Sequence, residues 1–126
     1  MNIMKFGGSS VGSVGRINSV VEIIKSSFQQ TKKGVVIFSA YQGVTDKLIG
    51  AGTIAASGNE VYLKIYDELQ DLHITTAKEL ITIQRQSNIL AEIKLVLRQL
   101  EEILHGIYLI KELSPKTLDH LMSFGE

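Results

Sequence analysis

A turn rich in glycine and serine near the N-terminus carries the residues best suited to binding a phosphate. Lys5 is followed by Gly7, Gly8, Ser9 and Ser10, directly after apolar residues that are typical of a buried strand. Glycines at a strand-to-helix turn allow backbone N–H groups to face an anion, and the helix that follows adds the positive end of its dipole. The lysine supplies a mobile cation, and the serines supply hydroxyl donors. The pattern therefore predicts a phosphate-binding loop.

This turn matches neither of two common nucleotide-binding fingerprints. A Walker A loop places its lysine after the glycines, and the dinucleotide-binding fingerprint requires Gly-x-Gly-x-x-Gly after the first strand. Neither arrangement occurs in the turn. A plain flexible connection between a strand and a helix is therefore at least as good an interpretation of the turn taken alone. The local pattern leaves both interpretations open.

A second group of turn-forming and hydroxyl residues follows the next apolar run. Ser39, Ala40 and Thr45 lie in this group, after the continuous apolar stretch 35–38. In open parallel sheets, ligands bind at the edge formed by the carboxyl ends of the strands, so we expect the two loops to share one site. Thr45 is also a candidate N-cap of the next helix, and capping is compatible with ligand contact.

The elements that must position these loops are predicted to form a βαβ unit followed by a helix-rich segment. Strands are expected at residues 2–6 and 34–39, separated by an amphipathic helix at about residues 15–30. The fold class is therefore α/β. Two strands cannot form a sheet that is covered on both faces, so we expect further strands from residues beyond Glu126 or from another chain.

The segment from residue 59 to residue 111 is predicted to form at least two long helices, because Gly and Pro are absent between Gly58 and Gly106. Asn88 is the expected cap between them. A packed helical hairpin fits the second helix better than a two-stranded coiled coil, because its apolar face is wide. Ser114 and Pro115 then predict the start of another helix, with Glu126 at its end. The wide face comprises Leu90, Ile93, Leu97, Leu100, Leu104 and Ile107.

Composition argues against several classes of function. The 13 basic and 13 acidic residues give a net charge of +0, which does not suit a nucleic-acid binder or a polybasic membrane contact and favours a small-molecule partner. The chain has no cysteine, and its three histidines are isolated, so no metal site is predicted. No signal peptide and no apolar run of about 20 residues is visible, which predicts a cytoplasmic location.

Three short signatures follow one another along the chain: Lys5-Phe6-Gly7-Gly8-Ser9-Ser10-Val11, then Val36-Ile37-Phe38-Ser39-Ala40 with Gly43-Val44-Thr45, and finally Ser123-Phe124-Gly125-Glu126. In this order they resemble the aspartokinases, which are members of the amino-acid kinase family. The segments 104–107 and 112–119 are similar to the aspartokinase half of bifunctional aspartokinase–homoserine dehydrogenases. The resemblance implies that residues 1–126 are the N-terminal part of a single catalytic domain, a carbamate-kinase-like αβα sandwich.

The resemblance also implies an activity: transfer of the γ-phosphoryl group of ATP to the side-chain carboxylate of L-aspartate, the first step toward lysine, threonine and methionine. Mg²⁺ would be held by the nucleotide phosphates. Because the acceptor carboxylate is already ionised at neutral pH, positioning and charge neutralisation matter more than a general base. On this template Lys5 is catalytic and contacts the phosphates together with Gly7, Gly8 and Ser9. The resemblance further implies that the substrate is contacted by Ser39, Ala40, Thr45 and Glu126.

Two other interpretations remain open. Another amino-acid kinase, acting on glutamate, carbamate or a nucleotide, would use the same phosphate chemistry. A non-catalytic helical interaction module would instead use the apolar face at residues 90–107 and would bind no phosphate. We expect the 126-residue chain to be inactive by itself, because the resemblance places the adenine site beyond Glu126. We also expect a homo-oligomer with elements exchanged between copies, since uncovered strand edges associate.

Overall fold

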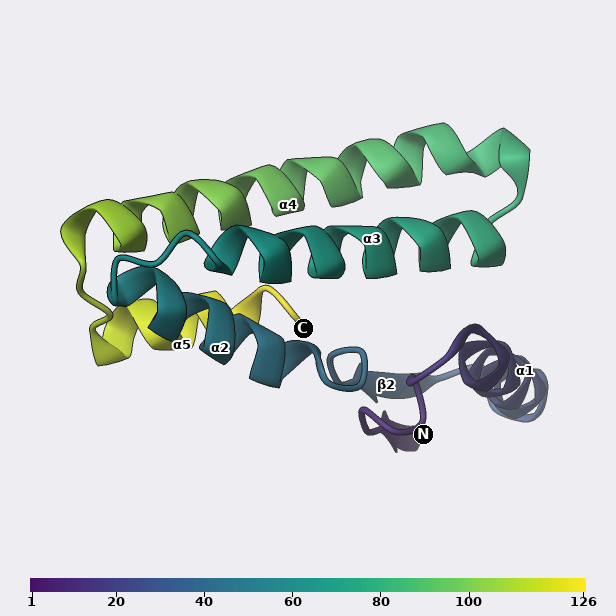
Figure 1. The fold of residues 1–126 in the computed structure, drawn as a ribbon. Helices are drawn as coiled ribbons and strands as arrows, with labels where there is room; N and C mark the ends of the chain where they lie inside the picture. Colours follow the sequence, from purple (N-terminus) through teal and green to yellow (C-terminus); the bar gives the residue numbers. More distant parts are fainter. The chain divides into compact units, whose positions relative to one another are not determined.

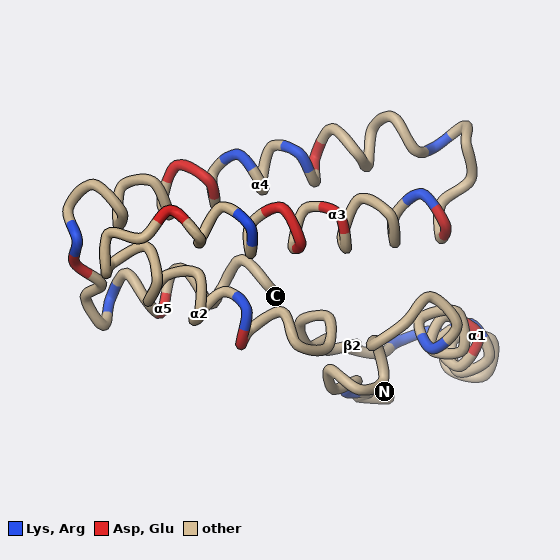
Figure 2. The backbone as a smooth tube through the Cα atoms, in the orientation of Figure 1, with Lys and Arg blue, Asp and Glu red and all other residues tan.

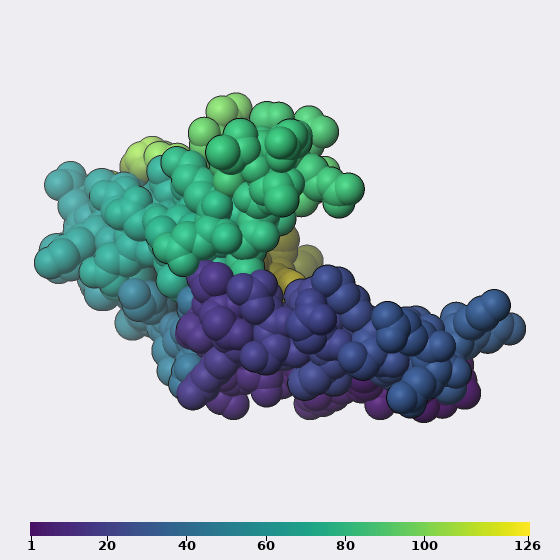
Figure 3. Space-filling model, turned by 90° about the vertical axis from the view of Figure 1, so that its right-hand side faces the viewer, coloured from purple at the N-terminus to yellow at the C-terminus, as the bar shows by residue number.

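The computed structural model describes residues 1–126, which form two compact units. The first unit comprises Met1–Gly43 together with Glu126, and the second comprises Val44–Gly125. Both strands and one helix belong to the first unit, whereas the second unit is entirely helical (Figure 1). In the space-filling view the first unit forms one continuous body, coloured purple to blue (Figure 3). The predicted α/β class, with a βαβ start and a helix-rich continuation, is confirmed.

The first unit is a βαβ element. Strand β1 (Asn2–Phe6) pairs in parallel with β2 (Gly34–Phe38), and helix α1 (Val14–Gln30) connects them. The predicted bounds of the three elements agree with the structure to within one residue. In the register of the pair, Asn2 lies opposite Gly34 and Phe6 lies opposite Phe38. Both strands therefore end at the same edge of the sheet.

Helix α1 covers one face of this small sheet. The Asn2 side-chain amide donates hydrogen bonds to Ser27 Oγ at 3.2 Å and to Thr31 Oγ1 at 3.0 Å. At the other strand, a Cβ atom on Gly34 would lie 3.2 Å from the Phe28 ring, so the glycine allows α1 to approach β2 closely. These contacts place alternate strand residues, beginning with Asn2 and Gly34, against the helix.

The opposite face of the sheet is exposed and mostly apolar. Ile3, Val35 and Ile37 are 67%, 45% and 47% exposed, and the alternation of side chains along a strand puts them on one face with Lys5. No element of the first unit covers this face. This agrees with the expectation that two strands alone cannot form a sheet covered on both sides.

The second unit contains α2 (Val44–Ala56), α3 (Tyr62–Leu80), α4 (Ile83–Ile110) and α5 (Pro115–Ser123). Helices α3 and α4 lie side by side as a hairpin, α2 packs against both, and α5 packs against α2 (Figure 1). The predicted helical hairpin is therefore confirmed. Its core draws on all four helices, because the largest fully buried side chains are Val44, Leu48, Leu69, Leu104 and Leu121. No helix in the chain is both long enough and apolar enough to cross a lipid bilayer.

The break between the two long helices lies at Ile81 and Thr82, so the prediction of a cap at Asn88 is wrong. Both residues have extended backbone, and Asn88 lies exposed within α4. The Gln86 side-chain amide donates to the carbonyl oxygens of Lys78 at 2.9 Å and of Ile81 at 2.8 Å. An amide from α4 therefore satisfies carbonyls at the end of α3 that have no partner in the helix. No glycine or proline marks this break.

A buried tyrosine joins the two helices of the hairpin. Tyr66 on α3 donates its hydroxyl to the backbone carbonyl of Leu97 on α4 at 3.0 Å. Burial, reinforced by the nearby carboxylates of Glu101 and Asp67, raises the pKa of Tyr66 above its ordinary value of 10.0. Since the neutral phenol donates this hydrogen bond, ionising Tyr66 in the folded chain is unfavourable.

Helices α2 and α5 meet closely at a glycine. A Cβ atom on Gly52 would lie 2.5 Å from Leu121 Cδ2 and 3.3 Å from Leu113 Cδ2, whereas a Cβ on Gly50 would meet no atom within 4 Å. The start of α5 is as predicted: Ser114 Oγ accepts the backbone N–H of Thr117 at 3.1 Å, and proline is the first helical residue.

Candidate functional site

The two loops predicted to share a site leave the sheet at the same edge. The first, residues 7–13, is called here the glycine loop, and the second, residues 39–43, the second loop. Phe6 and Phe38 end the paired strands with their ring centroids 5.9 Å apart, and the Ser39 N–H donates to the Phe6 carbonyl at 2.9 Å. The loops therefore begin side by side, as the parallel-sheet argument predicts.

The second loop packs against the glycine loop at two glycines, tightly at Gly12 and at ordinary contact distance at Gly8. A Cβ atom on Gly8 would lie 3.4 Å from the Ala40 carbonyl oxygen and 3.8 Å from Gln42 Cα. At Gly12 a Cβ would lie 3.2 Å from Gln42 Cβ and would overlap Gln42 Oε1. The two loops therefore touch through backbone at Gly8 and through a side chain at Gly12.

The hydrogen bonds of the glycine loop leave several backbone donors free, among them the adjacent N–H groups of Gly8 and Ser9. The N–H of Ser10 donates to the Gly7 carbonyl at 3.0 Å, and the N–H of Val11 donates to the Gly8 carbonyl at 3.3 Å. No acceptor in the chain takes the N–H of Gly8 or Ser9. Gly8 is partly exposed and Ser9 is exposed. Free backbone N–H groups on an accessible loop are the donors with which loops of this type bind anions.

The end of the glycine loop is fixed to α1 by two hydrogen bonds. Ser13 is the N-cap of α1, and its hydroxyl oxygen accepts the Arg16 backbone N–H at 3.2 Å. The Arg16 guanidinium reaches back along the chain and donates from Nη1 to the Ser9 carbonyl at 2.7 Å. The sequence interpretation did not include Arg16. A cation in the first turn opposes the helix dipole, and this was the one signal that could have drawn attention to it.

Lys5 is the penultimate residue of β1 and lies on the sheet face opposite α1. It is exposed and makes no hydrogen bond or ion pair within the chain, so its ammonium group is available to a ligand. In the second loop, Ser39 is half-buried and Ala40 is 6% exposed. The first unit thus brings the predicted phosphate-contacting residues together with these two, because all of them lie at or next to the ends of β1 and β2.

Two predicted substrate contacts lie outside these loops. Thr45 is the second residue of α2, in the second unit, so the expectation that it serves as the N-cap is wrong. The residue before the helix is Gly43, which has a φ of +83°. Glu126 is exposed and belongs with the first unit. The prediction that it lies at the end of the last helix is wrong, because α5 ends at Ser123 and a turn follows. Neither Thr45 nor Glu126 has a hydrogen bond from its side chain.

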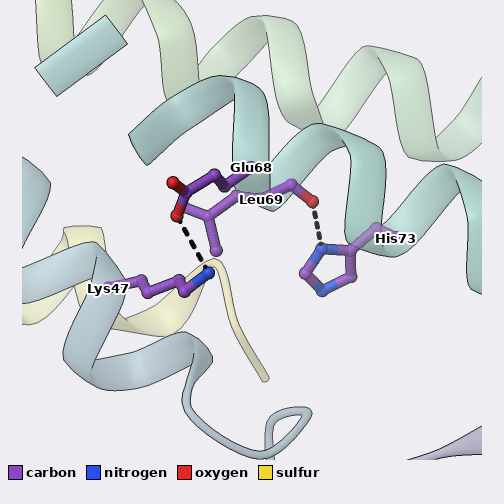
Figure 4. A network of polar contacts seen from close by, with 4 residues as sticks. All are labelled: Lys47, Glu68, Leu69 and His73. Carbon is purple, nitrogen blue, oxygen red and sulfur yellow. Dashed lines mark hydrogen bonds and ion pairs between the residues drawn. The ribbon is translucent and has the colours of Figure 1, made fainter. Parts of the chain in front are cut away.

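Other polar groups of the chain serve helix packing. The Lys47 ammonium group of α2 pairs with Glu68 of α3 at 3.0 Å, and His73 Nδ1 donates to the Leu69 carbonyl at 2.7 Å (Figure 4). Charges of both signs are interspersed along α3 and α4 (Figure 2). No group of three or more His, Cys, Asp or Glu side chains could hold a metal ion.

Comparison with known proteins identifies the family. A model of the amino acid kinase family matches residues 1–126, and the chain belongs to that family. It is 38% identical over 128 residues to aspartokinase 1, chloroplastic, of Arabidopsis thaliana, covering 98% of this chain and 21% of that protein. It is 29% identical to a bifunctional aspartokinase/homoserine dehydrogenase 1 of Zea mays, covering 99% of this chain and 13% of that protein. The chain thus spans about a fifth of its relatives' length, or less.

The solved structures confirm the predicted fold class. Over its whole length the chain matches E. coli aspartokinase III with a TM-score of 0.80 and 25% identity, covering 26% of that protein. That enzyme was solved in complex with lysine and aspartate, and in a second structure with aspartate and ADP. The parallel strands and packed helices described above are therefore those of the start of an amino-acid kinase αβα fold.

Proposed function

We propose that this chain is part of an aspartate kinase, which transfers the γ-phosphoryl group of ATP to the side-chain carboxylate of L-aspartate. The observation that carries the proposal is the glycine loop with its free Gly8 and Ser9 N–H groups. This loop directly follows the end of β1, the strand that carries the unpaired Lys5. Similarity to aspartokinases along the whole chain supports the choice of substrate, as does the complex of E. coli aspartokinase III with aspartate and ADP.

In the proposed mechanism the glycine loop and Lys5 neutralise phosphate charge. The N–H groups of Gly8 and Ser9 donate to phosphate oxygens, Gly7 keeps the turn free of side chains, and the Lys5 ammonium group stabilises charge on the transferring group. A carboxylate oxygen of aspartate attacks the γ-phosphorus, the bond to the bridging β–γ oxygen breaks, and ADP leaves. No net proton transfer is needed, because the attacking carboxylate is ionised at neutral pH.

The remaining candidate residues are proposed to bind the amino acid. Ser39 and Ala40 line the edge from which the second loop leaves the sheet, and Thr45 follows in the chain. The Glu126 carboxylate would pair with the α-ammonium group of aspartate. Holding two anions, the nucleotide and the acceptor, within reaction distance is the main catalytic requirement, and it calls for cations and N–H donors on one side and a carboxylate for the ammonium on the other.

Mg²⁺ in this proposal arrives with the nucleotide. We propose that the nucleotide phosphates hold the ion, since phosphate oxygens are ligands that Mg²⁺ commonly uses. When bound, it would share in neutralising the phosphate charge.

Three broader expectations belong to the same proposal. We propose that residues 1–126 belong to one catalytic domain, that the protein acts in the cytoplasm in the biosynthesis of amino acids, and that it forms a homo-oligomer, with elements exchanged between copies where strand edges are uncovered. Analytical ultracentrifugation of the complete gene product tests the association, and cell fractionation tests the location. A strictly monomeric protein would contradict the former.

The decisive experiment measures acyl phosphate formed by the complete gene product. With ATP, Mg²⁺, L-aspartate and hydroxylamine, the acyl phosphate is trapped as the hydroxamate, and formation that depends on both substrates is expected. Activity with L-glutamate, carbamate or a nucleotide in place of aspartate would show a different amino-acid kinase. Absence of any nucleotide binding would favour a helical interaction module. The 126-residue chain by itself is expected to give no hydroxamate.

A further inference from the structure

We propose that Arg16 is a positioning residue that sets the conformation of the glycine loop and thereby aims the Ser9 donors at a nucleotide phosphate. The loop conformation is a property of the chain itself, whereas its consequence for phosphate binding rests on the proposed function. Arg16 lies in the first turn of α1, is exposed, and uses a single guanidinium nitrogen to contact the loop.

The peptide group between Ser9 and Ser10 is held at both ends. Its carbonyl oxygen accepts from Arg16 Nη1 at 2.7 Å, and its N–H donates to the Gly7 carbonyl at 3.0 Å. Because a peptide group is planar, hydrogen bonds at its two opposite ends fix the orientation of the plane. The Ser9 backbone is thereby fixed on its carbonyl side, and the directions of the Ser9 N–H and hydroxyl groups are restricted with it.

The Arg16 contact is the strongest candidate for holding this loop. Apart from the bonds by which Ser13 caps α1, the remaining loop bonds are backbone turn bonds of 3.0 and 3.3 Å. The loop opens with Gly7 and Gly8, which permit many conformations. A hydrogen bond from a charged donor is shorter and about twice as strong as a neutral one. Arg16 is itself anchored, because its backbone N–H is bound by the N-cap residue Ser13. The helix end and the loop therefore form one connected unit.

The position of Arg16 supports a specific role over a general surface charge. A cation in the first turn is disfavoured by the positive end of the helix dipole, so a compensating contact is expected, and the Ser9 carbonyl provides it. The same contact offsets the partial negative charge of the Ser9 carbonyl oxygen, which would otherwise repel an incoming anion. An arginine that simply bound a phosphate would need no hydrogen bond to the loop.

The experiment compares three variants of the complete gene product. Arg16→Met removes the donor, and Arg16→Lys retains a single charged donor of similar reach. Arg85→Met is the matched control, because Arg85 is also exposed, is likewise the third residue of its helix, and makes no side-chain hydrogen bond. Circular dichroism first establishes that each variant is folded.

Hydrogen exchange of the loop is the first measurement, and it requires no catalytic activity. Arg16→Met is expected to speed exchange at the Ser10 and Val11 amides about tenfold, whereas Arg16→Lys and Arg85→Met leave it near the wild-type rate. Unchanged exchange in Arg16→Met overturns the proposal. If that variant does not fold, Arg16→Lys decides: exchange within threefold of wild type supports the positioning role, and a tenfold increase overturns it.

Affinity for MgADP, measured by calorimetry, is the second readout. Arg16→Met is expected to bind about ten- to a hundredfold more weakly, with Arg16→Lys restoring most of the affinity. A loss in Arg16→Lys as large as in Arg16→Met would mean that the fork of the guanidinium contacts the phosphate directly, which overturns the positioning role. If wild-type protein binds no MgADP, the proposed function fails, and the exchange experiment still decides whether Arg16 holds the loop.

Discussion

Adding one methyl group to α2 should change the stability of the protein in opposite directions at two glycines, which lie two positions apart. Gly50→Ala places a Cβ where no atom lies within 4 Å, while Gly52→Ala places one 2.5 Å from Leu121 Cδ2 and 3.3 Å from Leu113 Cδ2. Both substitutions gain about 1 kcal/mol of helix propensity, because glycine is the more flexible residue. Only the second also meets a packed neighbour.

The size of the penalty at Gly52 follows from the burial of its neighbour. Leu121 is 0% exposed, so its Cδ2 atom cannot move aside into solvent. Overpacking of such a core costs about 1–3 kcal/mol, which exceeds the propensity gain over most of its range. We expect Gly50→Ala to stabilise the protein by about 0.5–1 kcal/mol and Gly52→Ala to destabilise it by about 1 kcal/mol.

Urea unfolding followed by helical circular dichroism measures both changes. A double-mutant cycle makes the test sharper, because Leu121→Ala leaves a cavity and by itself costs about 2–5 kcal/mol. If the clash is the cause, the methyl of Gly52→Ala fills part of that cavity, and the double variant should be more stable than the sum of the single variants by at least about 1 kcal/mol. Additive effects, or a Gly52→Ala variant as stable as Gly50→Ala, would refute the packing argument.

Three further predictions concern the loops and the hairpin. Lys5→Met should lower kcat/KM for aspartate phosphorylation at least about a hundredfold, because it removes a charge-stabilising contact. The control Lys25→Met removes an exposed cation from α1 and should leave kcat/KM unchanged. A near-normal kcat in Lys5→Met would exclude Lys5 from the mechanism. Gly12→Ala should weaken MgADP binding by displacing the second loop, whereas Gly15→Ala, with open space around it, should not; equal affinities would contradict the loop contact. Because the folded-state pKa of Tyr66 lies above 10.0, the contribution of this group to stability is complete below pH 10 and is lost as the pH rises through the folded-state pKa. Tyr66→Phe should therefore reduce the alkaline loss of stability, measured as urea midpoints from pH 7 to 11. An unchanged profile would assign that loss to other groups.

Sequence periodicity predicted those elements whose boundaries are set locally. The strands follow from apolar runs, and α5 follows from Ser114 and Pro115, whose cap and first-turn roles need no distant partner. The break at Ile81 was missed because an amide five residues further on holds it, and side chains that act across a turn leave no periodic signal. Asn88 was a reasonable cap by type, yet the continuous apolar face of α4 kept it helical.

The candidate site was predictable to the extent that it depends on strand order. Parallel pairing places the two loops at one edge, and this could be inferred from an apolar run on either side of one helix. The close approach of Gln42 to Gly12 and the bond from Arg16 to Ser9 depend on long side chains that find partners in three dimensions. Residue spacing carries no information about such contacts.

The exposed apolar face of the sheet also affects the risk of aggregation while the chain is being synthesised. The β2 run of four apolar residues has no charge and no proline, which is the composition that promotes pairing between unfinished chains. Two exposed lysines, Lys32 and Lys33, directly precede β2, which begins with Gly34. Like charges that flank an aggregation-prone strand act as gatekeepers, since stacking chains in register would bring them together. Protection of the nascent sheet therefore rests on electrostatic repulsion at its N-terminal end.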